Sequence, residues 1–252
     1  MHPIAATGFQ LKVDDYANAR PSYPAAALQR IKEIIPQEAH VLDLAAGTGI
    51  MTQLLVPLGY QVTAVEPADN MRNKLKELLP EVPCFKGTAQ NIPVPSESQD
   101  AVVIAQAFHW FDDIESLNEI HRVLKPQGHL ILIWNTESPR SIWTAKLRQL
   151  YEKHTEGVPS NRTGRWRQVF DTDEAKTLYD LPLEYIQVTN DFPTDKDRAW
   201  SRVISNSYVA ILPEDEIQKL KKDAFTVLDD PENEFNGVYS HETDLVWVRK
   251  RV

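Results

Sequence analysis

The sequence predicts an α/β protein in which a parallel β-sheet is covered by helices on both faces. Short apolar runs of strand length alternate with segments whose apolar residues recur at helical spacing, and this alternation continues to about residue 135. The run at 100–108 is apolar for most of its length, which is typical of a central parallel strand buried on both faces. With 252 residues, the chain fits one such domain with elaborations or at most two small domains.

Composition excludes several classes of protein. An apolar content of 42% with only 9 glycines indicates a packed core. The formal net charge of -9 disfavours a nucleic-acid binder, which would carry a basic face. The single cysteine, Cys84, excludes an internal disulfide, and the seven histidines show no metal-ligand spacing, so we predict no metal. No apolar run approaches a membrane span and residues 1–12 lack a signal-peptide core, so we expect a cytoplasmic protein with no membrane partner.

The most informative stretch is a strand, a turn of small residues and the start of a helix. His40–Leu44 reads as a buried strand that carries one carboxylate, Asp43. Residues 45–49 form the turn, and Thr48 is available to cap the helix that begins near Ile50. Backbone can approach a ligand closely only where side chains are minimal, so this unit suits nucleotide binding. The alternative is an ordinary Gly-rich turn.

The remaining elements follow in order along the chain. A helix beginning at Pro24 precedes the first strand, and further helices begin at Asp69 and near Ile114. After the first strand, we expect strands at 61–65, 82–85, 100–108 and 129–135, then helices at 143–151, 197–208 and 214–229, a strand near 183–188 and a last strand, in either direction, at 242–252.

Four polar or small-residue segments stand at successive strand ends. These are the turn at 45–49, Glu66, the loop at 88–90 and the segment at 106–110. Because the carboxyl ends of parallel strands meet at one edge of a sheet, the four segments are expected to form one site. A carboxylate such as Glu66 can accept hydrogen bonds from both hydroxyls of a ribose. Each segment alone could be ordinary surface; together they predict a nucleotide-like cofactor at this edge.

With these motifs the sequence resembles the class I S-adenosylmethionine-dependent methyltransferases. The matching motifs are VLDLAAGTG, AVEP, GTAQNIPVPSESQDAVVIAQAFHWFD and EIHRVLKPQGHLILIWN, in the family's order. YANARPSYP and AQAFHWFD are similar to the small-molecule group that includes trans-aconitate methyltransferase. The resemblance implies a doubly wound, Rossmann-like, mostly parallel seven-stranded sheet with the last strand antiparallel and a helical cap. It implies an N-terminal lid and helix at 1–39, a cofactor-binding core at 40–135, a cap insertion at 136–182 and a C-terminal part of the sheet, with a further helical cap insertion, at 183–252.

The resemblance also assigns residues to the cofactor, S-adenosyl-L-methionine. Two positions depart from the family pattern: Ala45 stands where glycine is more common, and Gln90 where an acid is common. The extra methyl of Ala45 would be tolerated in an ordinary backbone region, and the amide of Gln90 can still accept a hydrogen bond. The implied cofactor-binding residues are Tyr16, Arg20, Asp43, Ala45, Ala46, Gly47, Gly49, Glu66, Pro67, Thr88, Ala89, Gln90 and Gln106.

The implied activity is methylation of a small molecule, at a carboxylate or hydroxyl oxygen, by in-line displacement. His109 is the candidate catalytic base; it could equally be a structural histidine beside the cofactor. Trp110, Trp143 and Arg165 are the candidate substrate-binding residues. Arg165 is one of several arginines expected in the cap, of which one or two should face the site: Arg140, Arg162, Arg165, Arg167, Arg198 and Arg202.

A second class of function stays open at this point. The chain could bind the cofactor without transferring a methyl group, as a regulatory partner or as a catalyst of rearrangement. A protein or nucleic-acid methyltransferase is disfavoured by the acidic balance of the chain. We expect a monomer or a homodimer.

Overall fold

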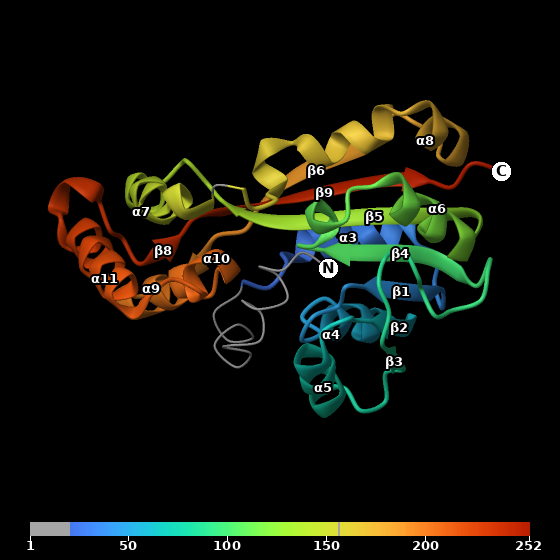
Figure 1. Ribbon diagram of the computed structural model, residues 1–252, viewed down its shortest axis with the longest axis horizontal. Helices are drawn as coiled ribbons and strands as arrows, with labels where there is room; N and C mark the ends of the chain where they lie inside the picture. The colour runs from blue at the N-terminus through green and yellow to red at the C-terminus, as the bar shows by residue number, and fades with distance from the viewer. Residues whose placement is uncertain (1–20, 156) are drawn as a thin grey trace.

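The computed structural model describes residues 21–155 and 157–252 (Figure 1). The predicted N-terminal lid residues Tyr16 and Arg20 lie outside the described residues. The described chain forms one sheet with helices around it, and a group of helices extends beyond one end of the sheet (Figure 1).

The central sheet has seven strands in the order β3-β2-β1-β4-β5-β9-β6. Six strands point the same way, and β9 is antiparallel to both of its neighbours, β5 and β6. This confirms the predicted mostly parallel sheet with an antiparallel last strand. The strands are β1 (His40–Leu44), β2 (Gln61–Val65), β3 (Cys84–Phe85), β4 (Gln99–Ala105), β5 (Leu124–Glu137), β6 (Glu184–Thr189) and β9 (His241–Arg249).

Strand order reverses between β1 and β4. The strands β2 and β3 lie on one side of β1, whereas β4 and β5 lie on the other. In open sheets of this kind, ligands bind beyond the carboxyl ends of the strands at the point of reversal. Residues 45–49 leave β1 there, and residues 106–110 leave β4 there. The topology therefore brings two of the predicted site segments together.

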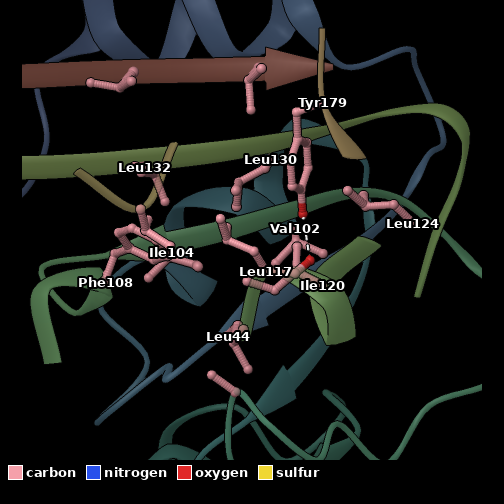
Figure 2. Packing of buried hydrophobic residues seen from close by; sticks show 14 of the residues in the cluster. Leu44, Val102, Ile104, Phe108, Leu117, Ile120, Leu124, Leu130, Leu132 and Tyr179 are labelled. Atoms are coloured by element: carbon pink, nitrogen blue, oxygen red, sulfur yellow. Dashed lines mark hydrogen bonds between the residues drawn. The ribbon is translucent and has the colours of Figure 1, made fainter. Parts of the chain in front are cut away.

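Helices cover both faces of the sheet because successive strand residues point to opposite sides. On one face, α6 (Ile114–Val123) packs over Val102 and its neighbours. Figure 2 shows this cluster, in which the hydroxyl of Tyr179 donates a 2.8 Å hydrogen bond to the carbonyl of Leu117. On the other face, α3 (Ala25–Ile34) packs over Val103.

The helix after the small-residue turn is shorter than predicted. The α-helix α4 spans only Thr52–Leu55, and the 3₁₀ helix η1 (Val56–Leu58) continues it. Pro57 lies in η1, and a proline removes an N–H that a longer α-helix would need. Thr48 does not cap α4, since Met51 holds the N-cap position and the Thr48 hydroxyl is buried without a hydrogen-bond partner. The next helix, α5 (Asp69–Leu78), begins at Asp69 as predicted.

Helices from two separate parts of the sequence gather beyond the sheet (Figure 1). They share a hydrophobic cluster of their own, in which Trp143, Leu147 and Leu220 are buried. A two-stranded antiparallel sheet of β7 (Phe192–Pro193) and β8 (Val238–Tyr239) joins this group. The helices are α7 (Ile142–Glu152), α9 (Lys196–Ile204), α10 (Ser207–Ala210) and α11 (Glu214–Asp229).

The single helix predicted over 197–208 is in fact two helices, α9 and α10. The hydroxyl of Ser205 and the amide of Asn206 both donate hydrogen bonds to the carbonyl of Arg202. Such local side-chain bonds compete with the backbone bonds of a continuing helix, and they account for the break.

The segment between α7 and β6 packs partly against the face of the sheet. It contains η3 (Lys153–Thr155), η4 (Asn161–Thr163), η5 (Arg165–Asp171) and α8 (Asp173–Leu178). Trp166 and Phe170 of η5 belong to the cluster on the sheet face, together with Tyr179. We call α7, α9, α10 and α11 the outer helices. Only the first part of the predicted cap insertion belongs to them. The predicted domain boundaries stay a prediction.

Candidate functional site

The turn after β1 is tied to the neighbouring strand by its backbone. The N–H of Ala46 donates to the carbonyl of Val65 at 3.1 Å, and the N–H of Gly49 donates to the carbonyl of Ala46 at 3.0 Å. Gly49 has a φ of +89°, and a Cβ placed there would lie 3.0 Å from the side chain of Leu75. Glycine is therefore required at 49 both by conformation and by the closeness of α5.

Ala45 adopts a left-handed backbone conformation, with a φ of +59°. The condition under which the extra methyl of Ala45 would be tolerated without cost, an ordinary backbone region, is therefore not met. For an L-residue this conformation costs roughly 1–2 kcal/mol, because the Cβ crowds the following carbonyl oxygen. The turn keeps its shape despite that cost, since the hydrogen bonds on either side fix the backbone.

We predict that Ala45→Gly stabilises the protein by about 0.5–1 kcal/mol, because relief of the strain exceeds the added entropy of the unfolded glycine. Urea unfolding checks this. Ala46→Gly is the matched control: Ala46 is not among the residues with positive φ, so the same change there should destabilise by a similar amount. Destabilisation by Ala45→Gly would contradict the assigned strain.

Glu66 directly follows β2, is 4% exposed and binds the backbone of the turn. Its Oε2 accepts the N–H of Gly47 at 2.8 Å, and its Oε1 accepts the N–H of Ala68 at 2.8 Å. Burial raises the pKa of Glu66, and the two backbone N–H groups act in the opposite direction. Because a carboxylate has about four acceptor positions, each oxygen can accept a further hydrogen bond from a ligand.

A cavity of about 150 Å³ lies over these residues, and we call it the turn cavity. Its wall brings together residues that the sequence placed at four different strand ends. The predicted site residues that line it are Ala45, Gly47, Glu66, Pro67, Thr88, Ala89, Gln90, Gln106 and Trp110. Ala46 lines a smaller adjoining cavity of about 50 Å³.

Gln90 is oriented by a neighbour that the sequence analysis did not single out. Its Nε2 donates to Oδ2 of Asp113 at 3.0 Å, while Oδ1 of Asp113 accepts the N–H of Ser116 at the start of α6. The amide nitrogen is thus committed to Asp113, which leaves Oε1 of Gln90 as a hydrogen-bond acceptor.

Asp43 lies behind the turn, fully buried in β1. Its Oδ2 accepts the hydroxyl of Thr52 at 2.5 Å, and its Oδ1 has no hydrogen-bond partner. Burial raises the pKa of Asp43 to about 7; the Thr52 bond opposes this and the negative charge of Glu66 adds to it. Two carboxyl groups in low dielectric therefore share this part of the site.

The turn cavity fits the cofactor that the family resemblance implies. Leu44, Ala89 and Phe111 provide apolar walls of the kind that an adenine ring packs against. Glu66 provides acceptors for the two ribose hydroxyls, and Oε1 of Gln90 provides one for an exocyclic amine. The backbone groups of the turn stand close to the space because no large side chain covers them.

Gln106 connects this cavity to a second one. It has a φ of +59°, its N–H donates to the carbonyl of Ile133 at 2.8 Å, and its Nε2 donates to the carbonyl of Asn135 at 3.2 Å. Backbone strain of this kind in a non-glycine residue is often found at functional sites. Gln106 lines the turn cavity, its small neighbour and a further cavity of about 330 Å³ under the outer helices, which we call the cap cavity.

The cap cavity begins where β4 and β5 end. Trp110 lines both this cavity and the turn cavity, so a ligand in one lies next to a ligand in the other. Most of the remaining wall is polar and comes from the outer helices, from Thr155 and from residues 158–163. It includes His109, Asn135, Glu137, Arg148, Tyr151, Ser160, Asn161, Arg162, Arg202, Asn206 and Tyr208.

His109 lines the cap cavity, and a hydrogen bond from Trp134 indicates which tautomer its neutral imidazole adopts. Nε1 of Trp134 lies 3.3 Å from Nδ1 of His109. An indole nitrogen can only donate, so Nδ1 must be the acceptor, and the proton of the neutral imidazole lies on Nε2. In this state Nε2 of His109 carries the proton. The predicted role of His109 as a general base stays a prediction.

Two arginines of the cap cavity contact one buried carboxylate, and a third contacts the main chain of the same residue. Glu137 is 4% exposed; its Oε2 contacts Nη2 of Arg162, and its Oε1 lies 2.9 Å from Nη2 of Arg202. Arg148 donates to the carbonyl of Glu137 at 3.3 Å and lies 3.5 Å from the carboxylate of Glu152. Two guanidinium groups thus share Glu137, which leaves one positive charge in excess.

Two predicted substrate-binding residues do not reach this cavity. Trp143 is fully buried in the cluster of the outer helices, where it packs against Phe235 and Tyr239. Arg165 is exposed on η5 and is not part of the cavity wall. Arg162 and Arg202, rather than Arg165, line the cap cavity. A signal for Arg202 was available, since Ala199, Arg202 and Val203 share one face of a helix.

Other kinds of site are not found among the residues that the structure describes. No group of three or more histidine, cysteine, aspartate or glutamate side chains in residues 21–155 and 157–252 could hold a metal ion. Within the same ranges, no helix has the length and apolar character needed to cross a membrane.

Comparison with known proteins supports the family resemblance. Residues 42–132 match the family model described as a methyltransferase domain. An uncharacterized methyltransferase-like protein of Schizosaccharomyces pombe is 36% identical over 165 residues, which are 64% of each chain. An uncharacterized methyltransferase of Mycobacterium tuberculosis is 43% identical over 143 residues, 56% of this chain and 58% of that one. The chain thus aligns with less than two thirds of the length of these relatives.

The fold has solved relatives with bound cofactor. A Haemonchus contortus phosphoethanolamine N-methyltransferase in complex with S-adenosyl-L-methionine superposes with a TM-score of 0.60 at 14% identity, covering 100% of this chain and 61% of that one. At this identity the likeness shows the fold alone.

Proposed function

We propose that this chain, whose core belongs to the S-adenosylmethionine-dependent methyltransferases, methylates an oxygen of a small organic acid. The observation that carries the proposal is the junction of the two cavities. The turn cavity, which fits the cofactor, meets the cap cavity at Gln106 and Trp110, and the cap cavity carries an excess positive charge at Arg162 and Arg202. An anion suits such a cavity, because arginine donates two parallel hydrogen bonds to a carboxylate.

The residues of the turn cavity would hold the cofactor. Glu66 would accept the ribose hydroxyls, Gln90 would accept from the adenine amine, and the backbone of residues 45–49 would surround the methionine part. S-adenosylmethionine supplies a methyl group on a sulfonium, which an acceptor oxygen attacks in line with the departing sulfur. Gln106 and Trp110 would separate cofactor from acceptor and exclude water from the space between them.

A carboxylate acceptor needs no general base, since it is ionised at neutral pH. This agrees with the geometry of His109, whose Nδ1 is occupied by Trp134. We propose that His109, which lines the cap cavity, lies beside the acceptor without acting as its base. A hydroxyl acceptor would require that the Trp134 bond be broken or that another group take the proton.

His109→Gln is therefore expected to lower kcat by less than about tenfold, because the loss of a true general base costs about 10²–10⁴-fold. Steady-state kinetics between pH 6 and pH 9 would check this. We expect kcat to depend on pH in the same way in His109→Gln and in the wild type. The control is His40→Gln, at the opposite edge of the sheet. A loss of several hundredfold together with a changed pH profile would assign base catalysis to His109.

The direct test supplies S-adenosylmethionine with a panel of carboxylic acids, phenols and amines, and measures S-adenosylhomocysteine. Turnover on acids supports the proposal, and methyl ester products would identify the acceptor oxygen. Tight cofactor binding without turnover on any acceptor would instead favour a cofactor-binding protein that does not transfer the methyl group. A cytoplasmic location, a monomeric or homodimeric state and a partner set without nucleic acid are also part of the proposal.

A further inference from the structure

A fourth cavity adjoins the cap cavity on the side away from the turn cavity. This outer cavity, of about 680 Å³, lies between the sheet and the 3₁₀ helices η4 and η5. Its floor includes Gln187 of β6 and Asp244 of β9, and its opposite wall includes Trp166 and Arg167. The outer cavity and the cap cavity share the residues Thr136, Glu137, Arg148, Asn161 and Arg162.

The ion pair between Arg162 and Glu137 stands in the wall shared by the two cavities. The Glu137 side chain is 3% exposed, whereas the Arg162 side chain is 27% exposed. Arg162 therefore borders solvent through the outer cavity while its guanidinium contacts a buried carboxylate. A molecule that passes from the outer cavity into the cap cavity meets this pair.

The charges around Glu137 are unbalanced. Among the described residues, Glu137 is the only carboxylate in ion-pair contact with Arg162 or Arg202. His241 lies 3.9 Å from Oε1 of Glu137, but it adds no positive charge, because burial lowers the pKa of His241 well below its usual value. Nε of Arg202 is buried without a partner. An excess buried charge is costly unless an anion accompanies it.

The two arginines differ in how firmly they are held. Arg202 is 4% exposed on α9, and it lies 3.2 Å from the side-chain oxygen of Asn206. Arg162 belongs to the short helix η4, which lies between Gly157 and Gly164. Both glycines have positive φ, and a Cβ at either would meet no atom within 4 Å. Open space around both ends permits Arg162 to change partner without repacking of the core, whereas Arg202 is fixed.

We propose that Arg162 determines acceptor specificity by exchanging Glu137 for the carboxylate of an acid that enters through the outer cavity. After the exchange, Glu137 remains paired with Arg202, and the incoming carboxylate balances the charge that was in excess. An amide or ester of the same acid could not balance it and would be excluded. The inference rests on the proposed function for its acceptor class, but the anion site itself can be tested without turnover.

The test measures malonate binding to the full chain loaded with S-adenosylhomocysteine, by calorimetry at constant ionic strength. Arg162→Gln is expected to weaken malonate binding about tenfold, the effect of losing one charge-assisted interaction. Glu137→Gln is expected to strengthen it about tenfold, because the competing carboxylate is removed. Arg165→Gln is the matched control: it removes the same charge from the same segment, outside both cavities, and should change nothing.

Opposite effects of the two ion-pair variants separate exchange from a structural role, which would make both variants weaker. Absence of malonate binding to the wild type, or equal affinity in Arg162→Gln and Arg165→Gln, overturns the inference. The comparison of these two arginine variants decides the matter even if Glu137→Gln does not fold. Malonate binding at Arg162 without methylation of any acid would refute the proposed function and keep the anion site. Turnover of acids by Arg162→Gln at the wild-type rate would keep the proposed function and refute the role of Arg162.

Discussion

Glu66→Ala is expected to abolish cofactor binding under ordinary assay conditions. The carboxylate is buried, holds the turn through Gly47 and keeps acceptor capacity on both oxygens. Hydrogen bonds to a charged group contribute roughly 1.5–3 kcal/mol each. Loss of two such bonds to the ribose would therefore weaken the binding of S-adenosylhomocysteine by on the order of a hundredfold or more. Isothermal titration calorimetry of the variant against the wild type measures this directly.

Two further variants make that result interpretable. Glu66→Gln preserves the shape and one acceptor oxygen, so its affinity should lie between those of the wild type and the alanine variant. Glu81→Ala removes an exposed carboxylate after α5 and should leave affinity unchanged. Urea unfolding shows whether each variant is folded at the titration temperature. Affinity close to wild type in a folded Glu66→Ala protein would mean that the site assignment is wrong at its centre.

The strands of the core could be predicted because each is short, apolar and bounded by turn residues. His40–Leu44 shows this most simply, since the predicted and observed strands coincide. The antiparallel last strand came from the family resemblance. The order of the strands in the sheet was not predicted, because periodicity carries no information on strand order. The break between α9 and α10 was not predictable from spacing, since it depends on side-chain bonds from Ser205 and Asn206 to one carbonyl.

Some residues of the candidate site could likewise be predicted from the sequence, and others could not. Glu66 and Gln106 could be placed from the sequence because each directly follows a strand, and the sheet brings strand ends together. Arg162 could not be separated from Arg165, because the difference between them is contact with Glu137 in a distant strand end. The conformation of Ala45 was equally hidden: a left-handed alanine has no sequence signal, and only the hydrogen bonds of the folded turn impose it.

The stability of the protein without cofactor should fall as the pH rises, and Asp43 is the main cause. The pKa of Asp43 is raised to about 7, so the folded protein keeps a proton there that the unfolded chain releases near the ordinary aspartate pKa of 3.8. Between these two pH values the folded state binds more protons than the unfolded state, so raising the pH favours unfolding. Each pKa unit corresponds to about 1.4 kcal/mol, so the full shift amounts to about 4 kcal/mol.

Asp43→Asn should remove this pH dependence. Urea unfolding at several values between pH 5 and pH 8 would show a downward slope in the wild type and a much smaller slope in the variant. Glu33→Gln is the control: Glu33 is exposed and bonded to Arg30, which lowers its pKa, so it is ionised in both states over this range. Equal slopes in Asp43→Asn and the wild type would assign the titration to another group.

The expected slope also bears on how the turn is maintained. Asp43 has an oxygen without a partner, and its neighbour Glu66 carries a second buried carboxyl group. A protein selected for stability alone would not keep both, because two buried acids disfavour the folded state as the pH rises. A ligand that binds only the folded state offsets such a cost by mass action. Saturating S-adenosylhomocysteine should therefore raise the unfolding free energy of the wild type across the whole pH range, and Glu66→Ala should lose that increase.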